Sequence, residues 1–78
     1  MPEDAITDAI NKKLTNWFTY HAPVNGQVEQ YERIRSAAHI FAQVILMNTP
    51  LCADQTAAIR KVREAVMTAN AAIACKGE

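Results

Sequence analysis

The chain has 78 residues, half of them hydrophobic, and its eight basic and eight acidic residues cancel to a formal net charge of zero. This length predicts one domain, residues 1–78, and the balanced charge argues against general duplex-DNA binding, whose affinity comes largely from basic groups that displace counterions. No apolar run approaches the roughly 20 residues needed to span a bilayer. Two isolated cysteines and the lack of a secretory signal predict an intracellular protein with reduced thiols.

A short first helix is predicted over about residues 3–15. Pro2, Glu3 and Asp4 are typical of a helix start, because proline fits the first turn and carboxylates suit the positive end of the helix dipole. The apolar row of this helix consists of Ala5, Ile6, Ile10 and Leu14. Residues 16–20 are rich in aromatic side chains, and the proline and glycine within 21–26 predict a break in the helix.

Two long helices are predicted to follow, over about residues 27–48 and 53–75. Pro50 ends the first of them, since the residue before a proline is pushed out of the helical region, and Gly77 ends the second. The joint between them is short, so the two helices should be antiparallel neighbours. The sequence therefore predicts an all-α fold with a short N-terminal helix and two long antiparallel helices.

The two long helices differ in the width of their apolar faces. Helix 53–75 has an ordinary one-sided stripe of Ile59, Val62, Val66, Ala69 and Ile73. Helix 27–48 has a similar main stripe, but additional apolar residues widen its arc to roughly 200°, about twice what a one-faced helix needs. The main stripe is Ile34, Ala38, Phe41 and Ile45, and the additional residues are Ala37, Ile40, Val44 and Met47.

One antiparallel partner cannot cover so wide an arc. We therefore expect the remaining apolar surface to be buried against other copies of the chain in a homo-oligomer. The alternative is that the first helix folds back over the pair and covers that surface within one protomer.

Residues that could support catalysis or bind a metal do not form a recognisable pattern. His21 and His39 have no cysteine or carboxylate at metal-ligand spacing, and the two glycines, Gly26 and Gly77, cannot make a glycine-rich phosphate loop. Ser36 precedes His39 by one turn, but no fixed acid accompanies them. We expect no catalytic residues, no metal and no cofactor, and hence a protein that is not an enzyme.

Aromatic and basic residues gather around the first joint. The run Trp17 to His21 is expected on a turn, and Arg33 and Arg35 follow closely. Aromatic faces beside guanidinium groups suit a ligand with flat bases and charged phosphates, because aromatics stack on bases and the arginine fork pairs with phosphate. The alternative is that Trp17, Phe18 and Tyr20 only clamp the first helix onto the helix pair.

Three segments around these residues resemble signature blocks of one phage family, the cyclic-oligonucleotide sponges that block the bacterial immune system CBASS (the second anti-CBASS protein type). The segments are FTYHAP at 18–23, QYERIR at 30–35 and EAVMTANAAIA at 64–74. The resemblance covers nearly all of residues 18–76, whereas 1–16 form a longer N-terminal lead than this family is expected to have. It implies a helical protomer, dimers assembled into a hexamer, and no catalysis.

The resemblance also implies a function and two sites. Family members act in the cytoplasm of the infected host, where they sequester cyclic dinucleotides and trinucleotides such as cyclic GMP-AMP. For cyclic dinucleotides, matching the blocks puts the base-stacking tyrosine at Tyr20 and the phosphate-binding basic residue at Arg35, with Arg33 and His21 as weaker candidates. No DNA and no membrane partner is implied.

Cyclic trinucleotides are implied to use a separate site, where protomers meet around a three-fold axis. A hydroxyl residue of the second helix and an arginine near the end of the third are expected there. Ser36 is the nearest hydroxyl, Cys75 stands at the arginine position, and Lys76 follows it. A competing interpretation is a small helical oligomer that binds another protein through the helix 27–48, as antitoxins and antirepressors do.

Overall fold

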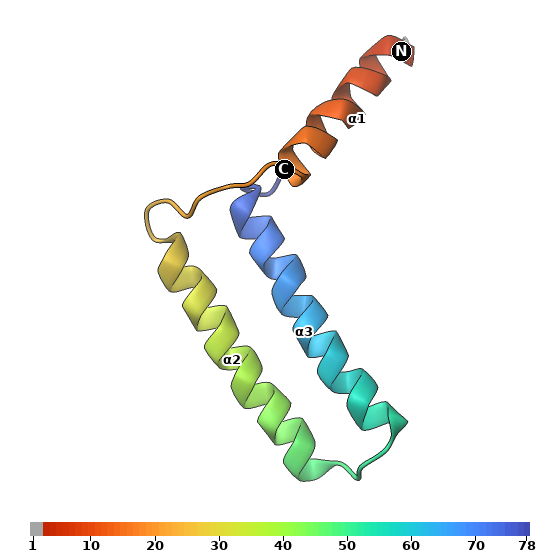
Figure 1. The fold of residues 1–78 in the computed structure, drawn as a ribbon, viewed down its shortest axis with the longest axis vertical. Helices are drawn as coiled ribbons and strands as arrows, with labels where there is room; N and C mark the ends of the chain where they lie inside the picture. Colours follow the sequence, from red (N-terminus) through yellow and green to blue (C-terminus); the bar gives the residue numbers. More distant parts are fainter. Residues whose placement is uncertain (1–2) are drawn as a thin grey trace.

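The computed structural model describes residues 3–78, so the expected role of Pro2 at the helix start lies outside the described residues. It contains helices α1 (Glu3–Trp17), α2 (Gln27–Asn48) and α3 (Ala53–Ala74) (Figure 1). The predicted all-α fold with one short and two long helices is confirmed. The bounds of α2 agree with the expectation and α3 ends one residue earlier. The first helix runs two residues further than expected, so Trp17 belongs to α1 and not to the turn.

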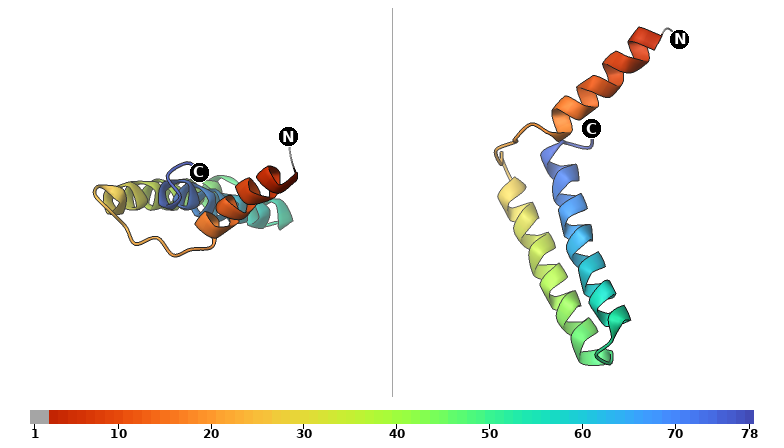
Figure 2. Two further views of the ribbon diagram at one scale, coloured as in Figure 1. Left: turned by 90° about the horizontal axis from the view of Figure 1, so that it is seen from above. Right: turned by 45° about the vertical axis from the view of Figure 1, so that its right-hand side comes forward.

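Helices α2 and α3 form an antiparallel hairpin and lie side by side in both views (Figures 1 and 2). Thr49 adopts an extended backbone before Pro50 and ends α2, as the sequence predicts. Along the seam, the predicted stripe of α3 is half-buried, and so are three of the four residues in the main stripe of α2. Phe41 is the exception, with 57% of its surface exposed.

A glutamine ties each end of the hairpin. Near the turn, the Gln55 side chain is buried and its Nε2 donates to the carbonyl oxygen of Thr49 at 3.1 Å and to the Thr49 hydroxyl at 3.0 Å. At the open end, Gln27 Nε2 donates to the carbonyl oxygen of Ile73 at 3.1 Å, while Gln27 Oε1 accepts from the backbone N–H of Val24 at 3.0 Å. These bonds hold the start of α2 beside the end of α3.

Helix α1 leaves the open end of the hairpin and points away from it (Figures 1 and 2). It is anchored at its C-terminal end alone, where Asn16 Nδ2 donates to the carbonyl oxygen of Cys75 at 3.4 Å and Trp17 Nε1 donates to that of Glu78 at 3.0 Å. The alternative in which the first helix folds back over α2 is therefore wrong. The apolar row of α1 is itself exposed, with Ile10 at 52%.

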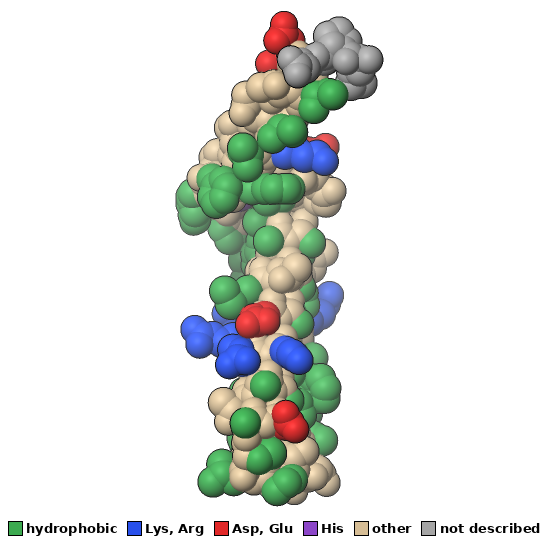
Figure 3. Space-filling model, turned by 90° about the vertical axis from the view of Figure 1, so that its right-hand side faces the viewer, with side chains coloured by type: hydrophobic (Ala, Val, Ile, Leu, Met, Phe, Trp, Pro, Cys, Tyr) green, Lys and Arg blue, Asp and Glu red, His purple; other side chains and the backbone are tan. Residues whose placement is uncertain are grey.

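The protomer has almost no core. Among the described residues, Cys75 and Gln55 alone are buried. The accessible surface is 6449 Å², whereas a compact monomer of this mass exposes about 4,700 Å². The radius of gyration is 17.2 Å against about 11.5 Å for a compact chain of this length. Figure 3 shows hydrophobic side chains over both ends of one face, with Lys and Arg gathered midway along the hairpin. None of the three described helices is long and apolar enough to cross a membrane.

Candidate functional site

An open pocket of about 530 Å³ lies where the linker between α1 and α2 passes the open end of the hairpin. The antiparallel arrangement brings the start of α2 and the end of α3 together there, and the linker adds a third wall. The pocket is lined by residues of the linker, of α2 and of α3: Tyr20, His21, Pro23, Val28, Tyr31, Arg35, Asn70, Ala71 and Ala74. Its volume falls within the range typical of small-molecule sites.

Helical spacing explains which residues of the hairpin face this pocket. On α2, Val28, Tyr31 and Arg35 are spaced by three and four residues, so they share one side of the helix. On α3, Ala74 lies four residues after Asn70 and three after Ala71, so it shares a side of the helix with both, and the two alanines leave room above the backbone. The pocket wall therefore combines two tyrosine rings, one imidazole, one guanidinium group and one amide with an otherwise apolar lining.

The arginine of the pocket is free to bind an anion. Among residues 3–78, one salt bridge is formed, between Arg60 and Glu64 at 3.8 Å within α3. Arg35 therefore has no carboxylate partner in the described part of the chain. A guanidinium without a carboxylate keeps all its donors available for a phosphate, which it can bind through two parallel hydrogen bonds.

The aromatic residues of the first joint divide into two groups. Trp17 ties α1 to the chain end through its indole N–H, as the clamp interpretation expects. Phe18 and Tyr20 are each 85% exposed and so clamp nothing within the protomer. Of these two, Tyr20 lines the pocket and Phe18 does not.

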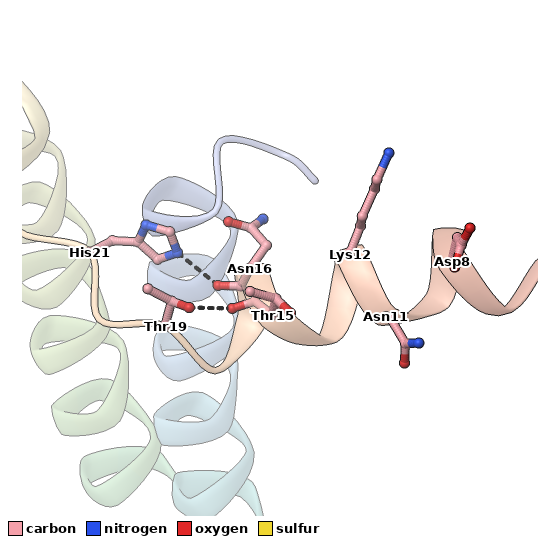
Figure 4. Close-up of a pocket in the computed structure, with 7 residues that line it drawn as sticks. All are labelled: Asp8, Asn11, Lys12, Thr15, Asn16, Thr19 and His21. Atoms are coloured by element: carbon pink, nitrogen blue, oxygen red, sulfur yellow. Dashed lines mark hydrogen bonds between the residues drawn. The ribbon is translucent and has the colours of Figure 1, made fainter.

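His21 stands between the pocket and a second hollow. Its Nε2 lies 2.7 Å from the carbonyl oxygen of Asn16, a hydrogen bond that turns the ring toward α1 (Figure 4). The second hollow has a volume of about 580 Å³ and is lined by polar residues of α1 and the joint: Asp8, Asn11, Lys12, Thr15, Asn16, Thr19 and His21. It holds neither an aromatic ring other than His21 nor an arginine, so it suits a base and phosphate ligand less well than the first pocket.

Comparison with known families decides between the interpretations. Residues 11–74 match the family model described as Acb2/Tad1, hairpin domain. The chain belongs to the Acb2/Tad1 hairpin family. These are phage proteins that counter CBASS and Thoeris by sequestering cyclic nucleotides, and they are binders without catalytic activity. Comparison with curated proteins and with solved structures gave no significant match.

The match to the Acb2/Tad1 family begins within α1. Residues 11–17 of this helix lie inside the family domain, while its earlier residues precede the match. The resemblance noted in the sequence thus extends further toward the N-terminus than residue 18. Asn16 and Trp17, which anchor α1, lie inside the matched range, whereas the carbonyl groups that accept their hydrogen bonds, those of Cys75 and Glu78, follow it.

The remaining residues expected to bind the ligands of this family lie elsewhere on the protomer. Arg33 does not line the pocket, because it is two positions along the chain from both Tyr31 and Arg35 and therefore about 200° around the helix from each. Ser36 is exposed on α2. Lys76 follows α3 in a left-handed conformation with φ of 55°, and it too is exposed.

Among the residues that line the pocket, the sequence did not single out two whose side chains can hydrogen-bond or stack, Tyr31 and Asn70. The signal for Tyr31 was present, since it precedes Arg35 by one helical turn and must share its side of α2. Asn70 could be assigned to the pocket only once the rotation of α3 against α2 was known. Cys75, expected at an arginine position of the family, is buried instead, with its Sγ 3.9 Å from the carbonyl oxygen of Asn16.

Proposed function

We propose that the pocket between the linker and the hairpin binds a cyclic dinucleotide and withholds it from the host effector that it would activate. The observation that carries this proposal is that Tyr20 and Arg35 line the same pocket and that Arg35 has no carboxylate partner among the described residues. The family of the chain sequesters cyclic nucleotides. Cyclic GMP-AMP is the kind of ligand that we expect. Its two bases offer flat faces and its two phosphates offer charge.

Each side chain has a role that follows from its chemistry. Tyr20 stacks on a base, a contact that contributes roughly 1–3 kcal/mol. Arg35 pairs with a phosphate. His21 can contribute only its Nδ1, because Nε2 already bonds the Asn16 carbonyl. Arg33 contributes only if it reaches the ligand from a neighbouring protomer.

The pocket is open in the single protomer, and a second copy would complete it. The exposed surface exceeds that of a compact monomer by roughly 1,700 Å². The exposed surface includes apolar side chains of α2, where Ile40, Val44 and Met47 are 61%, 48% and 80% exposed. Obligate interfaces bury areas of this size. We propose that the protomers pair and assemble as a hexamer.

Cyclic trinucleotides are a second proposed ligand, bound between protomers of the assembled particle. Ser36 and Lys76 are both exposed and therefore available for such a site. Lysine is a point charge and lacks the planar fork of arginine, so this site should bind more weakly than one with arginine at position 75.

Ligand is withheld and not destroyed. Hydrolysis of a phosphodiester needs an activated water or nucleophile, usually supplied by metal-bound carboxylates and histidines or by a paired acid and base. In the described part of the chain, no three His, Cys, Asp or Glu side chains come together in a group that could hold a metal ion. The pocket itself contains no carboxylate.

A thermal-shift screen tests the proposed function. The purified protein is heated with cyclic GMP-AMP, cyclic di-AMP, cyclic di-GMP and a cyclic trinucleotide, with linear dinucleotides as controls. A ligand at 100 times its dissociation constant stabilises the folded state by about 2.7 kcal/mol, which gives a clear rise in Tm. If no cyclic dinucleotide raises Tm, the proposal is wrong, and an interaction with another protein through α2 becomes the better interpretation.

A further inference from the structure

Asn70 is the one polar side chain that α3 contributes to the pocket. It lies on the same side of the helix as Ala71 and Ala74, among residues too small to crowd a ligand. The resemblance to the sponge family gave it no role. Its position opposite Tyr31 and Arg35 of α2 places an uncharged amide beside the surfaces that would hold a base and a phosphate.

The Oδ1 atom of Asn70 is buried and has no hydrogen-bond partner among the described residues. An unsatisfied buried acceptor is unfavourable, because it has lost its hydrogen bond to water and gained none in exchange. No hydrogen bond from the described residues holds Oδ1 in its present orientation. Rotation about the Cβ–Cγ bond can therefore bring it to the pocket, where a ligand N–H would satisfy it.

We infer that Asn70 recognises the N6 amine of an adenine base bound in this pocket, and so favours ligands that contain adenine. This inference rests on the proposed function. An asparagine amide presents an acceptor beside a donor, and it pairs with adenine through two parallel hydrogen bonds. Adenine N6–H donates to Oδ1, and an adjacent ring nitrogen accepts from Nδ2.

The amide favours adenine because adenine fits it with either edge, whereas guanine fits it only through its Watson–Crick or minor-groove edge. N6–H stands next to N7 on one edge of adenine and next to N1 on the other. Guanine presents two acceptors, O6 and N7, on its major-groove edge, and there Oδ1 would face another oxygen. Asn70 is thus a specificity-determining residue, while Tyr20 and Arg35 contact features that all cyclic dinucleotides share.

Titration calorimetry tests the inference by measuring the affinity of two proteins, the wild type and Asn70→Ala, for each of two ligands. The ligands are cyclic di-AMP and its analogue with purine in place of both adenines, which lacks the exocyclic amine but keeps the ring nitrogens and phosphates. The wild type should bind cyclic di-AMP about tenfold more tightly than the analogue, the effect of one or two hydrogen bonds. Asn70→Ala should bind both ligands equally. Circular dichroism and particle mass should be unchanged, since alanine favours a helix.

Asn48→Ala is the matched control. This asparagine lies at the far end of the hairpin, where its Nδ2 donates to the Val44 carbonyl, and its variant should discriminate between the ligands as the wild type does. The inference is overturned if wild type binds the two ligands equally, if it binds cyclic GMP-AMP but not cyclic di-AMP, or if Asn70→Ala keeps the full discrimination. Failure of the wild type to bind any cyclic dinucleotide would instead overturn the proposed function.

Discussion

Tyr20 and Arg35 line one pocket although the first lies in the linker after α1 and the second on α2. The linker brings them together because Gln27, at the start of α2, holds both Val24 of the linker and Ile73 of α3. The proposed stacking surface and the proposed phosphate-binding group thus line the same pocket before any ligand binds. Their separate contributions can be measured one residue at a time.

Replacement of the stacking tyrosine should weaken binding without unfolding the protein. Tyr20→Ala removes a side chain that is 85% exposed, so helicity should not change. Loss of one base–aromatic contact should lower the affinity for cyclic GMP-AMP roughly tenfold to a hundredfold, measured by titration calorimetry. Phe18→Ala is the matched control, since Phe18 is equally exposed but does not line the pocket. Equal losses in the two variants would contradict the assigned role of Tyr20.

The charge of Arg35 should matter in the same assay. Arg35→Ala should lower the affinity for cyclic GMP-AMP by roughly tenfold to a hundredfold, because a hydrogen bond to a charged group contributes about 1.5–3 kcal/mol. Arg35→Lys should be tolerated if charge alone is required. Arg33→Ala, on another side of α2, should change the affinity far less. If Arg33→Ala is the more damaging variant, the phosphate contact has been assigned to the wrong arginine.

The exposed apolar face of α2 should mediate assembly. Light scattering during size-exclusion chromatography should give the wild type a mass several times 8.6 kDa, most consistent with six copies. Val44→Glu should lower that mass, because it places an unpaired charge in the interface. Gln43→Glu adds the same charge on the polar side of α2 and should leave the mass unchanged. A wild type that elutes as a monomer would refute the assembly.

Cyclic trinucleotides should respond to a different set of variants. Ser36→Ala and Lys76→Ala should weaken trinucleotide binding severalfold while leaving cyclic GMP-AMP binding intact, because neither residue lines the Tyr20 pocket. Calorimetry with both ligands on each variant measures the two changes in affinity separately. Parallel losses for the two ligands would mean that a single site serves both.

Bound ligand should be recovered intact. The protein and cyclic GMP-AMP are incubated at equal site concentrations with and without magnesium or manganese, the protein is heat-denatured, and the nucleotide is analysed by chromatography. The cyclic form should return in full yield and restart an effector assay, because the pocket offers no carboxylate to activate water. Linear products that increase with time and with protein would show hydrolysis.

Local signals in the sequence predicted the helices well. Pro50 and Gly26 mark the bounds of α2, and the hydrophobic period of α3 identified the stripe that packs on it. Trp17 was placed on a turn because it begins an aromatic run, yet no residue there breaks a helix before Pro23. The direction of α1 could not be predicted, since its apolar row suits a partner in the same protomer as well as one in another.

The residues of the candidate site were predictable only where a sequence pattern identifies them, and not where the rotation of one helix against another decides. Tyr20 and Arg35 followed from the family blocks, and helical geometry alone separates Arg35 from Arg33. Asn70 lies in the segment 64–74 that resembles a family block, but an asparagine among alanines does not indicate whether it faces α2 or points away from it. Only the packing of α3 on α2 shows that it reaches the pocket with Oδ1 unpaired.

In the proposed assembly, the near absence of a core among the described residues of one copy makes folding depend on more than one copy. Among the described residues only Cys75 and Gln55 are buried, so a single copy has little to hold it together, and the proposed contacts between copies would supply most of the stabilisation. Its melting temperature should therefore rise with protein concentration, and dilution should melt it. A freshly made chain would then gain a stable fold only as other copies accumulate. The concentration of folded binding pockets would rise more steeply than the total concentration of the protein.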